Sequence, residues 1–376
     1  MYVAKNLQGR IPLRIYAVPE GSVIPTHNIL MRIESTDPRC FWATTWFETL
    51  LMRVWYPTTV ATVSWHARQL IGGYLKKSSD TPDREVSFKL HDFGARGVSS
   101  FESAGIGGAA HLVNFSGSDT IAGMLCANEY YHAQLAPSSI PAAEHSCIMV
   151  WGEKREGEAF AYILSRLSTI SPLVAMPVDT YNFIHAVNVI WGKDMAQAVK
   201  KSGATIVLRT DSGVAEKAVL AVLRQADKTY GSALNKKGYK VLNGLRVLHS
   251  DNVHQETIKK VLSSMLKAGF SATNIVFGMG GALLQKVTRD TQKFAYKVSQ
   301  AEVDGIALSI AKRPRTAKGK ESKSGYLDLI KSPSGYETID RNTNKKGKSE
   351  LKLVFDNGKL LVDDRLDDIR ARAALL

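Results

Sequence analysis

Two kinds of hydrophobic pattern alternate along the middle of the chain. Continuous apolar runs, each short enough for one β-strand, occupy 172–179, 204–211, 245–251 and 274–281. Between them, segments such as 216–225 and 256–269 repeat their apolar residues at the spacing of one helical face. Gly269 follows the second of these and is placed to end a helix. The pattern predicts strands and helices in alternation.

Fully apolar strands separated by helices indicate a parallel sheet covered on both faces, in either a β/α barrel or a doubly wound sheet. In both folds ligands bind at the carboxyl ends of the strands. Three of the predicted strands end on Asp179, Asp211 and Asp251, and the fourth ends on the pair Gly280 and Gly281. Carboxylates can accept from ribose hydroxyls or hold Mg²⁺, and bare backbone N–H groups can bind phosphate. A single such Asp could be only a helix cap, but the set favours a phosphate–sugar site.

The two ends of the chain differ from its middle. Residues 1–85 contain four of the six tryptophans and have the look of a mixed, more β-rich region. The segment 311–325 is a basic loop, which is usually solvated and only sometimes binds an anion. Within 351–364, Asn357-Gly358 is a strong signal for a two-residue hairpin turn.

Charge and cysteine content narrow the class of protein. Lys and Arg outnumber Asp and Glu by 49 to 35, which suits an anionic partner such as nucleic acid, an acidic membrane surface or a phosphorylated metabolite. No zinc-finger, RRM or helix-turn-helix signature is present, which argues against nucleic acid. No apolar run is long enough to span a membrane and no signal-peptide core opens the chain, so we expect a soluble, cytoplasmic protein. Three scattered cysteines fit reduced thiols and give no metal-binding spacing.

Further candidate residues for chemistry lie before the strands described above. The stretch "HDFGARGVSS" places Phe93 and Arg96 in a glycine-containing turn that could present an aromatic face and a cation, or simply bury the ring. Asp119 follows another strand-like run. Glu144 and His145 precede an apolar stretch, and a histidine beside a carboxylate on a strand edge can change its charge near neutral pH. We expect His145 at such an edge.

These motifs together resemble one family. "HDFGARGVSS", "GSDTIAG", "PAAEHS", "VLRTDSG", "RVLHSD" and "FGMGGALLQKVTRD" occur in this order and at similar spacing in the nicotinamide phosphoribosyltransferases. These are homodimeric type II phosphoribosyltransferases of NAD salvage. The resemblance implies a β/α barrel-like phosphoribosyltransferase domain at 86–304. It also implies a smaller mixed α+β domain, incomplete at its N-terminus, built from 1–85 and 305–376.

The resemblance implies that nicotinamide reacts with 5-phosphoribosyl 1-pyrophosphate (PRPP) to give nicotinamide mononucleotide and pyrophosphate. Phe93 would stack on nicotinamide and Asp119 would bind its amide. The positions implied to hold the phosphates and the ribose are Arg96, Arg209, Asp211, Ser250, Asp251, Gly280, Gly281, Arg289, Lys297 and Lys312. His145 would be phosphorylated by ATP on the diphosphate side, and Asp179 would be a site carboxylate, direct or through Mg²⁺. Mg²⁺ and ATP are the implied cofactor and stimulating co-substrate.

The chain also departs from the family pattern. Family members have an upstream segment, close to a domain in size, that supplies site residues across the dimer interface. This chain begins near the point where that segment ends, so we expect a fragment, a truncated product or an enzyme whose N-terminal half is a separate chain. A catalytically silent remnant that binds nucleotide or a partner chain is the alternative function. Ser250 stands where the family usually has glycine, and Met279 and Ala282 flank the glycine pair.

Overall fold

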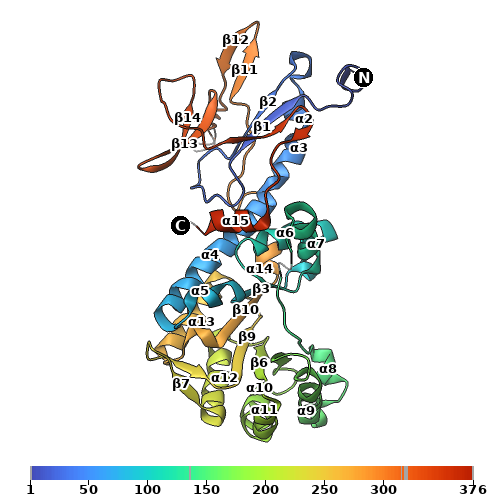
Figure 1. The fold of residues 1–376 in the computed structure, drawn as a ribbon, viewed down its shortest axis with the longest axis vertical. Helices are drawn as coiled ribbons and strands as arrows, with labels where there is room; N and C mark the ends of the chain where they lie inside the picture. The colour runs from blue at the N-terminus through green and yellow to red at the C-terminus, as the bar shows by residue number, and fades with distance from the viewer. Residues whose placement is uncertain (1, 135–136, 315, 317–320, 375–376) are drawn as a thin grey trace. The chain divides into compact units, whose positions relative to one another are not determined.

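The structure is a computed structural model that describes residues 2–134, 137–314, 316 and 321–374. Backbone contacts divide it into two compact units. The central unit is Pro57–Val287, and the terminal unit combines Met1–Tyr56 with Thr288–Leu376 (Figure 1). The change from one unit to the other falls in the first turn of helix α4, Trp55–Ser78, whereas the sequence-based domain limits were placed near residues 85 and 304.

The central unit is organised around a parallel sheet. Among the described residues this sheet has six strands in the order β4-β3-β10-β9-β6-β5, and every neighbouring pair is parallel. The strands are β3 Leu90–Asp92, β4 Gly117–Ser118, β5 Leu173–Pro177, β6 Thr205–Thr210, β9 Leu245–His249 and β10 Ile275–Met279. The last four confirm the strands predicted from apolar runs.

A short extended segment, 138–143, joins the two edges of this sheet. It forms a parallel bridge to β4 between Gly117 and Ser138, and another to β5 between Ala142 and Ala175. The order around the resulting ring is the order along the chain, which makes the fold barrel-like and excludes a doubly wound sheet. Ile140 from this segment packs on a small apolar cluster of β5, β6 and β9 residues that fills the interior.

Helices cover the outside of this sheet. In chain order after α4 they are α5 Pro82–Glu85, α6 Phe101–Leu112, α7 Ile121–Tyr131, α8 His145–Met149, α9 Glu156–Leu167, α10 Phe183–His185, the π-helix η6 Ala186–Asp194, α11 Ala196–Ser202, α12 Ala215–Tyr230, α13 Gln255–Lys267 and α14 Gly281–Leu284. Of the apolar residues predicted to share one helical face, Ile258, Val261, Leu262 and Met265 are buried in α13 and Leu266 is only partly buried. Gly269 adopts a positive φ of 80° just beyond the helix. Helix α12 continues past 225 because Ala226 extends its buried face. No helix in the described part of the chain is long and apolar enough to cross a lipid bilayer.

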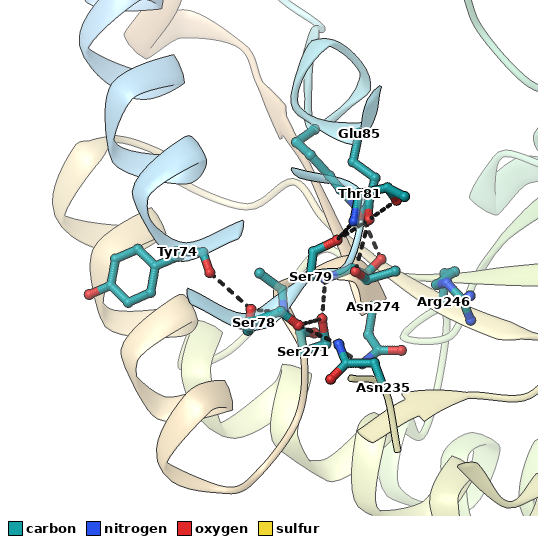
Figure 2. A network of polar contacts seen from close by, with 12 residues as sticks. Tyr74, Ser78, Ser79, Thr81, Glu85, Asn235, Arg246, Ser271 and Asn274 are labelled. Atoms are coloured by element: carbon teal, nitrogen blue, oxygen red, sulfur yellow. Dashed lines mark hydrogen bonds and ion pairs between the residues drawn. The ribbon is translucent and has the colours of Figure 1, made fainter. Parts of the chain in front are cut away.

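A buried polar cluster, which we call the amino-end cluster, lies where β3, β9 and β10 begin (Figure 2). Its centre is Lys89, whose Nζ donates to the carbonyl of Thr273 at 2.8 Å and pairs with Glu85 at 3.2 Å. Nearby, the hydroxyl of Ser271 donates to the carbonyl of Ser78 at 2.6 Å. These contacts join the end of α4 and α5 to the loop before β10, and they close this pole of the barrel with buried hydrogen bonds and an ion pair.

The terminal unit contains antiparallel sheets made from both chain ends. Its main sheet has the order β16-β15-β1-β2 among the described residues, from β1 Leu13–Ala17, β2 Met31–Ser35, β15 Lys352–Asp356 and β16 Lys359–Leu360. Two hairpins follow, β11 Gln300–Val303 with β12 Ile306–Ser309, and β13 Leu327–Ser332 with β14 Gly335–Asp340. A third hairpin, β7 Ser232–Leu234 with β8 Lys240–Leu242, belongs to the central unit. The helices of the terminal unit are α1 Tyr2–Asn6, α2 Ala43–Trp46, α3 Glu48–Leu51 and α15 Leu366–Ala373.

Two expectations for the chain ends have clear outcomes, and a third is only partly described. The Asn357-Gly358 turn is confirmed, because both residues have positive φ, 48° and 89°, between β15 and β16. The region 1–85 is more helical than expected, since β1 and β2 are followed by α2 to α5. Its tryptophans lie mostly on helices, so their number did not indicate β-strands, in which apolar and polar residues would alternate. Residues 315 and 317–320 of the basic segment lie outside the described part of the chain.

Candidate active site

The residues singled out for chemistry in the central unit follow the carboxyl ends of the barrel strands. By strand they are Phe93 after β3, Asp119 after β4, Glu144 and His145 after the 138–143 segment, Asp179 after β5, Asp211 after β6, Ser250 and Asp251 after β9, and Gly280 and Gly281 after β10. Parallel strands end at one edge, so these residues share one pole of the barrel. Direct contacts then link six of them, which we call the strand-end network: Glu144, His145, Asp179, Arg209, Asp211 and Ser250.

Asp179 is the centre of this network. One carboxylate oxygen is 3.0 Å from Nε2 of His145, and the other accepts from the backbone N–H of Asp211 at 2.9 Å and the hydroxyl of Ser212 at 2.6 Å. Burial raises the pKa of Asp179, but the hydrogen bonds from Ser212, His145 and Asp211 outweigh it and hold the pKa below its usual value. Asp179 therefore stays ionised and fixes both the imidazole and the chain that follows β6.

Arg209 is held from the other side by a carboxylate. Its Nη1 and Nη2 donate to the two oxygens of Glu144 at 3.1 and 3.0 Å, and Nη2 also lies 3.3 Å from Nδ1 of His145. The pKa of Glu144 is lowered, first by these bonds from Arg209, and the charge of Arg96 contributes in the same direction. The two cations and His145 therefore surround one carboxylate at the barrel mouth.

Asp211 is positioned by β9. The hydroxyl of Ser250 donates to its Oδ1 at 2.9 Å, and the backbone N–H of Ser250 donates to the carbonyl of Thr210 at 3.2 Å. Beneath them, Nδ1 of the fully buried His249 lies 2.9 Å from the hydroxyl of Thr210, and burial lowers the pKa of His249. A neutral histidine thus supports the two strand ends that carry Asp211 and Ser250.

Phe93 lies at the top of the barrel interior. Its backbone N–H donates to the carbonyl of Met279 at 3.0 Å, and the carboxylate of buried Asp92 accepts from the N–H of Gly94 at 2.7 Å. A Cβ added at Gly278 would lie 2.2 Å from the Phe93 ring, so the ring packs directly on this glycine. Burial raises the pKa of Asp92 to about 6. The ring therefore packs against the barrel interior and also borders the candidate site. These are the two alternatives that the sequence left open for Phe93, and both apply.

Asp119 and the glycine pair complete the central-unit residues. Asp119 is exposed, accepts from the hydroxyl of Ser139, and its N–H bonds to the carbonyl of Asp92 at 3.0 Å. Gly280 precedes the first turn of α14, and no atom lies within 4 Å of a Cβ built at Gly281. The space beside Gly281 is therefore open at the start of α14, which leaves room for a phosphate there.

Arg289, Lys297 and Lys312 belong to the terminal unit. All three are exposed; Arg289 pairs with Asp290 at 2.9 Å, and Nζ of Lys297 donates to the carbonyl of Tyr296 at 2.9 Å. Their role in binding phosphate stays a prediction.

The acidic residues here suit a metal shared with a ligand. Within the described ranges, no group of three or more His, Cys, Asp or Glu side chains could hold a metal by itself. Mg²⁺ usually binds one or two carboxylates together with phosphate oxygens and water. Asp211, with one oxygen engaged by Ser250, and the nearby Asp251 fit that mode. They would hold Mg²⁺ jointly with a bound diphosphate.

Two features of the site differ from the sequence reading. His145 begins helix α8 and does not lie on a strand edge, because the extended segment stops at residue 143. The pairing of Glu144 with Arg209 was not foreseen, since the two are 65 positions apart. The only sequence feature that pointed to Glu144 was its position next to His145.

Comparisons with known proteins agree with this arrangement. The model of the nicotinate phosphoribosyltransferase (NAPRTase) family matches residues 88–359. A nicotinamide phosphoribosyltransferase of Xanthomonas campestris pv. campestris is 46% identical over 99% of this chain and 81% of that protein. One from Acinetobacter baylyi is 30% identical over 97% of this chain and 77% of that protein.

Among solved structures, nicotinate-nucleotide pyrophosphorylase from Pyrococcus furiosus has the same fold, with a TM-score of 0.64 at 19% identity over 99% of this chain and 82% of that one. The resemblance recognised in the motifs is thereby confirmed. The chain belongs to the NAPRTase family.

Proposed function

We propose that this chain transfers the phosphoribosyl group of PRPP to nicotinamide, producing nicotinamide mononucleotide and pyrophosphate in NAD salvage. Family membership and the names of the two bacterial relatives support this reaction. The observation that carries it is the strand-end network, in which an arginine, a histidine and three carboxylates meet at one barrel mouth. A catalytically silent remnant is not favoured, because each of the six residues of the strand-end network contacts another member of it.

The reaction needs two kinds of electrostatic support. The ribosyl C1 becomes positive as the diphosphate leaves, so carboxylates near the ribose and cations near the diphosphate both lower the barrier. Asp211, oriented by Ser250, would face the ribose together with Asp251. Arg209 and Arg96 would take the diphosphate, and the N–H groups of the glycine pair would take the 5′-phosphate. Mg²⁺, when bound, would neutralise charge on the diphosphate.

The base would be held near β3 and β4. The Phe93 ring, fixed against Gly278, offers a face on which a pyridine ring can stack. Asp119 is an anion, which suits the neutral amide of nicotinamide better than the carboxylate of nicotinate or quinolinate. We therefore propose that Asp119 selects the amide.

ATP would act through His145. Nε2 is held by ionised Asp179 and Nδ1 faces Arg209, so the imidazole is oriented beside the diphosphate cations. A phosphoryl group there would add negative charge and oxygen ligands next to Mg²⁺. We propose that this phosphorylation by ATP favours product formation.

The cellular and oligomeric setting is likewise proposed. We propose a cytoplasmic homodimer with its sites at the subunit interface, where Arg289, Lys297 and Lys312 complete the phosphate site.

The direct test is an assay of the purified chain. With nicotinamide, PRPP and Mg²⁺ it should form nicotinamide mononucleotide, and ATP should stimulate the rate. With nicotinate in place of nicotinamide, turnover should be far lower. His145→Ala should lose the stimulation by ATP while keeping basal transfer. A folded chain that forms no mononucleotide under any of these conditions would contradict the proposed function.

For Asp119→Ala we expect a higher KM for nicotinamide, on the order of tenfold, because a hydrogen bond to a charged partner is lost. The KM for PRPP should change little. Steady-state kinetics with each substrate varied in turn gives both values. Equal increases for the two substrates would refute the assignment of Asp119 to the base.

A further inference from the structure

The guanidinium of Arg209 is already occupied by an anion of the protein itself. Two parallel bonds from Nη1 and Nη2 reach the two oxygens of Glu144, the same fork geometry by which arginine binds a phosphate. The remaining contact of Nη2 goes to His145. A diphosphate cannot use this fork in the same geometry while the Glu144 carboxylate remains there.

Of the two partners, Glu144 is the one able to leave. The Arg209 side chain is 10% exposed and lies on the central strand β6, whereas the Glu144 side chain is 57% exposed. Glu144 immediately precedes α8 and makes no capping bond to that helix. Moving it into solvent therefore breaks no other contact recorded for its side chain, and Arg209 stays in place.

Given the proposed function, we propose that Glu144 is an internal competitor of the diphosphate at Arg209, and that it sets the affinity of this anion subsite. A bound anion must replace two charge-assisted hydrogen bonds. A diphosphate has the charge and the oxygens to do so, and it can also engage Arg96, whose charge already acts on Glu144. Orthophosphate has fewer of both. The same displacement cost therefore leaves orthophosphate largely unbound at concentrations at which a diphosphate still binds.

A competing role and an orienting role for Glu144 predict opposite changes in anion affinity when the charge of Glu144 is removed. If Glu144 only held Arg209 in position, removing its charge would weaken anion binding. If it competes, Glu144→Gln should strengthen binding, because the neutral amide no longer pairs with the guanidinium. A half-exposed ion pair contributes on the order of 1 kcal/mol, which corresponds to about a fivefold change in affinity.

The experiment is calorimetric titration of inorganic pyrophosphate and of orthophosphate, in Mg²⁺ buffer, into the full chain. The matched control is Glu158→Gln, which removes the same charge from another Arg–Glu pair, that of Arg155 and Glu158, with bonds of 3.0 and 2.8 Å. Glu144→Asp keeps the charge and serves as a second variant, and thermal melting verifies that each protein is folded.

We expect Glu144→Gln to bind pyrophosphate about fivefold more tightly and orthophosphate more tightly by a similar factor, because both anions must displace the same carboxylate. Glu158→Gln should match the unsubstituted chain, and Glu144→Asp should show no such gain. Equal or weaker binding by Glu144→Gln would overturn the inference while leaving the proposed function intact. A folded, unsubstituted chain that does not bind pyrophosphate would instead count against the proposed function, and the inference would fall with it.

Discussion

The two poles of the central barrel both gather charged and polar residues, yet they are built differently. At the amino end, Lys89 is 6% exposed, and its ammonium contacts Glu85 and the backbone carbonyl of Thr273. At the carboxyl end, Glu144 is largely exposed and Asp211 and Ser250 are half-buried. One pole is closed by its own hydrogen bonds, and the other keeps oxygens and N–H groups open to solvent.

The two poles therefore serve different properties of the protein, the amino end its stability and the carboxyl end its chemistry. Buried polar groups that are fully paired hold neighbouring segments in one arrangement, and removing one partner is costly. At the carboxyl end, groups such as Asp211 and Glu144 are held by a neighbour and remain accessible to solvent, so they are oriented and still able to bind. We therefore expect substitutions at the amino end to change the free energy of unfolding, and substitutions at the carboxyl end to change kinetics.

The largest effect is expected at Lys89. Lys89→Met would leave the Glu85 carboxylate buried without its cation, and the free energy of unfolding should fall by about 3–5 kcal/mol. Urea denaturation measures the change, and Lys259→Met, at an exposed helix position, is the control. A loss below about 1 kcal/mol would show that the amino-end cluster does not stabilise the barrel.

Asp179→Asn should lower activity strongly and change the free energy of unfolding little, which is the opposite of what we expect for Lys89→Met. It removes the charge that fixes His145 and the N–H of Asp211, so we expect kcat/KM to fall on the order of a hundredfold. The free energy of unfolding should change by no more than about 1 kcal/mol, because the amide keeps the shape and part of the hydrogen bonding. Kinetics and denaturation of the same preparation give both numbers. Loss of stability in step with activity would erase the distinction between the poles.

A smaller effect should follow from Gly278→Ala. Its Cβ would lie 2.2 Å from the Phe93 ring and would force the ring to move. We expect the KM for nicotinamide to rise on the order of tenfold, as loss of one stacking contact implies, with little change for PRPP. Gly73→Ala, where nothing lies within 4 Å of the added Cβ, is the control. An unchanged KM for nicotinamide would mean that Phe93 does not hold the base.

The smallest effect concerns pH. Burial lowers the pKa of Lys89 to about 8 from 10.5, with Glu85 opposing the shift. Between these values the unfolded chain binds more protons than the folded one, so the contribution of Lys89 to stability rises with pH.

Relative to Lys89→Met, which has no group to titrate, the original chain should gain on the order of 1 kcal/mol from pH 7.5 to 9. Denaturation curves at both pH values test this. A difference that is flat or falls with pH would contradict the burial of a charged Lys89.

The sequence was informative where a local pattern determines structure. Apolar runs predicted β5, β6, β9 and β10, and the residues after them predicted which side chains gather at the carboxyl end. The 138–143 segment was not foreseen as part of the barrel, because "SSIPAA" has no apolar run and is held by its two neighbours. Pairings between distant positions were also out of reach, as with Glu144 and Arg209, since no local spacing encodes them.

Amide hydrogen exchange, measured with and without PRPP on the full chain, compares both poles in one experiment. It therefore tests whether substrate binds at the carboxyl end of the barrel and leaves the amino end unchanged. We predict slower exchange at 144–146, 209–213, 250–252 and 280–284 when PRPP is bound, and unchanged exchange at 78–89 and 271–274. Protection at the amino end, or protection scattered over the barrel with none at the carboxyl end, would contradict this prediction.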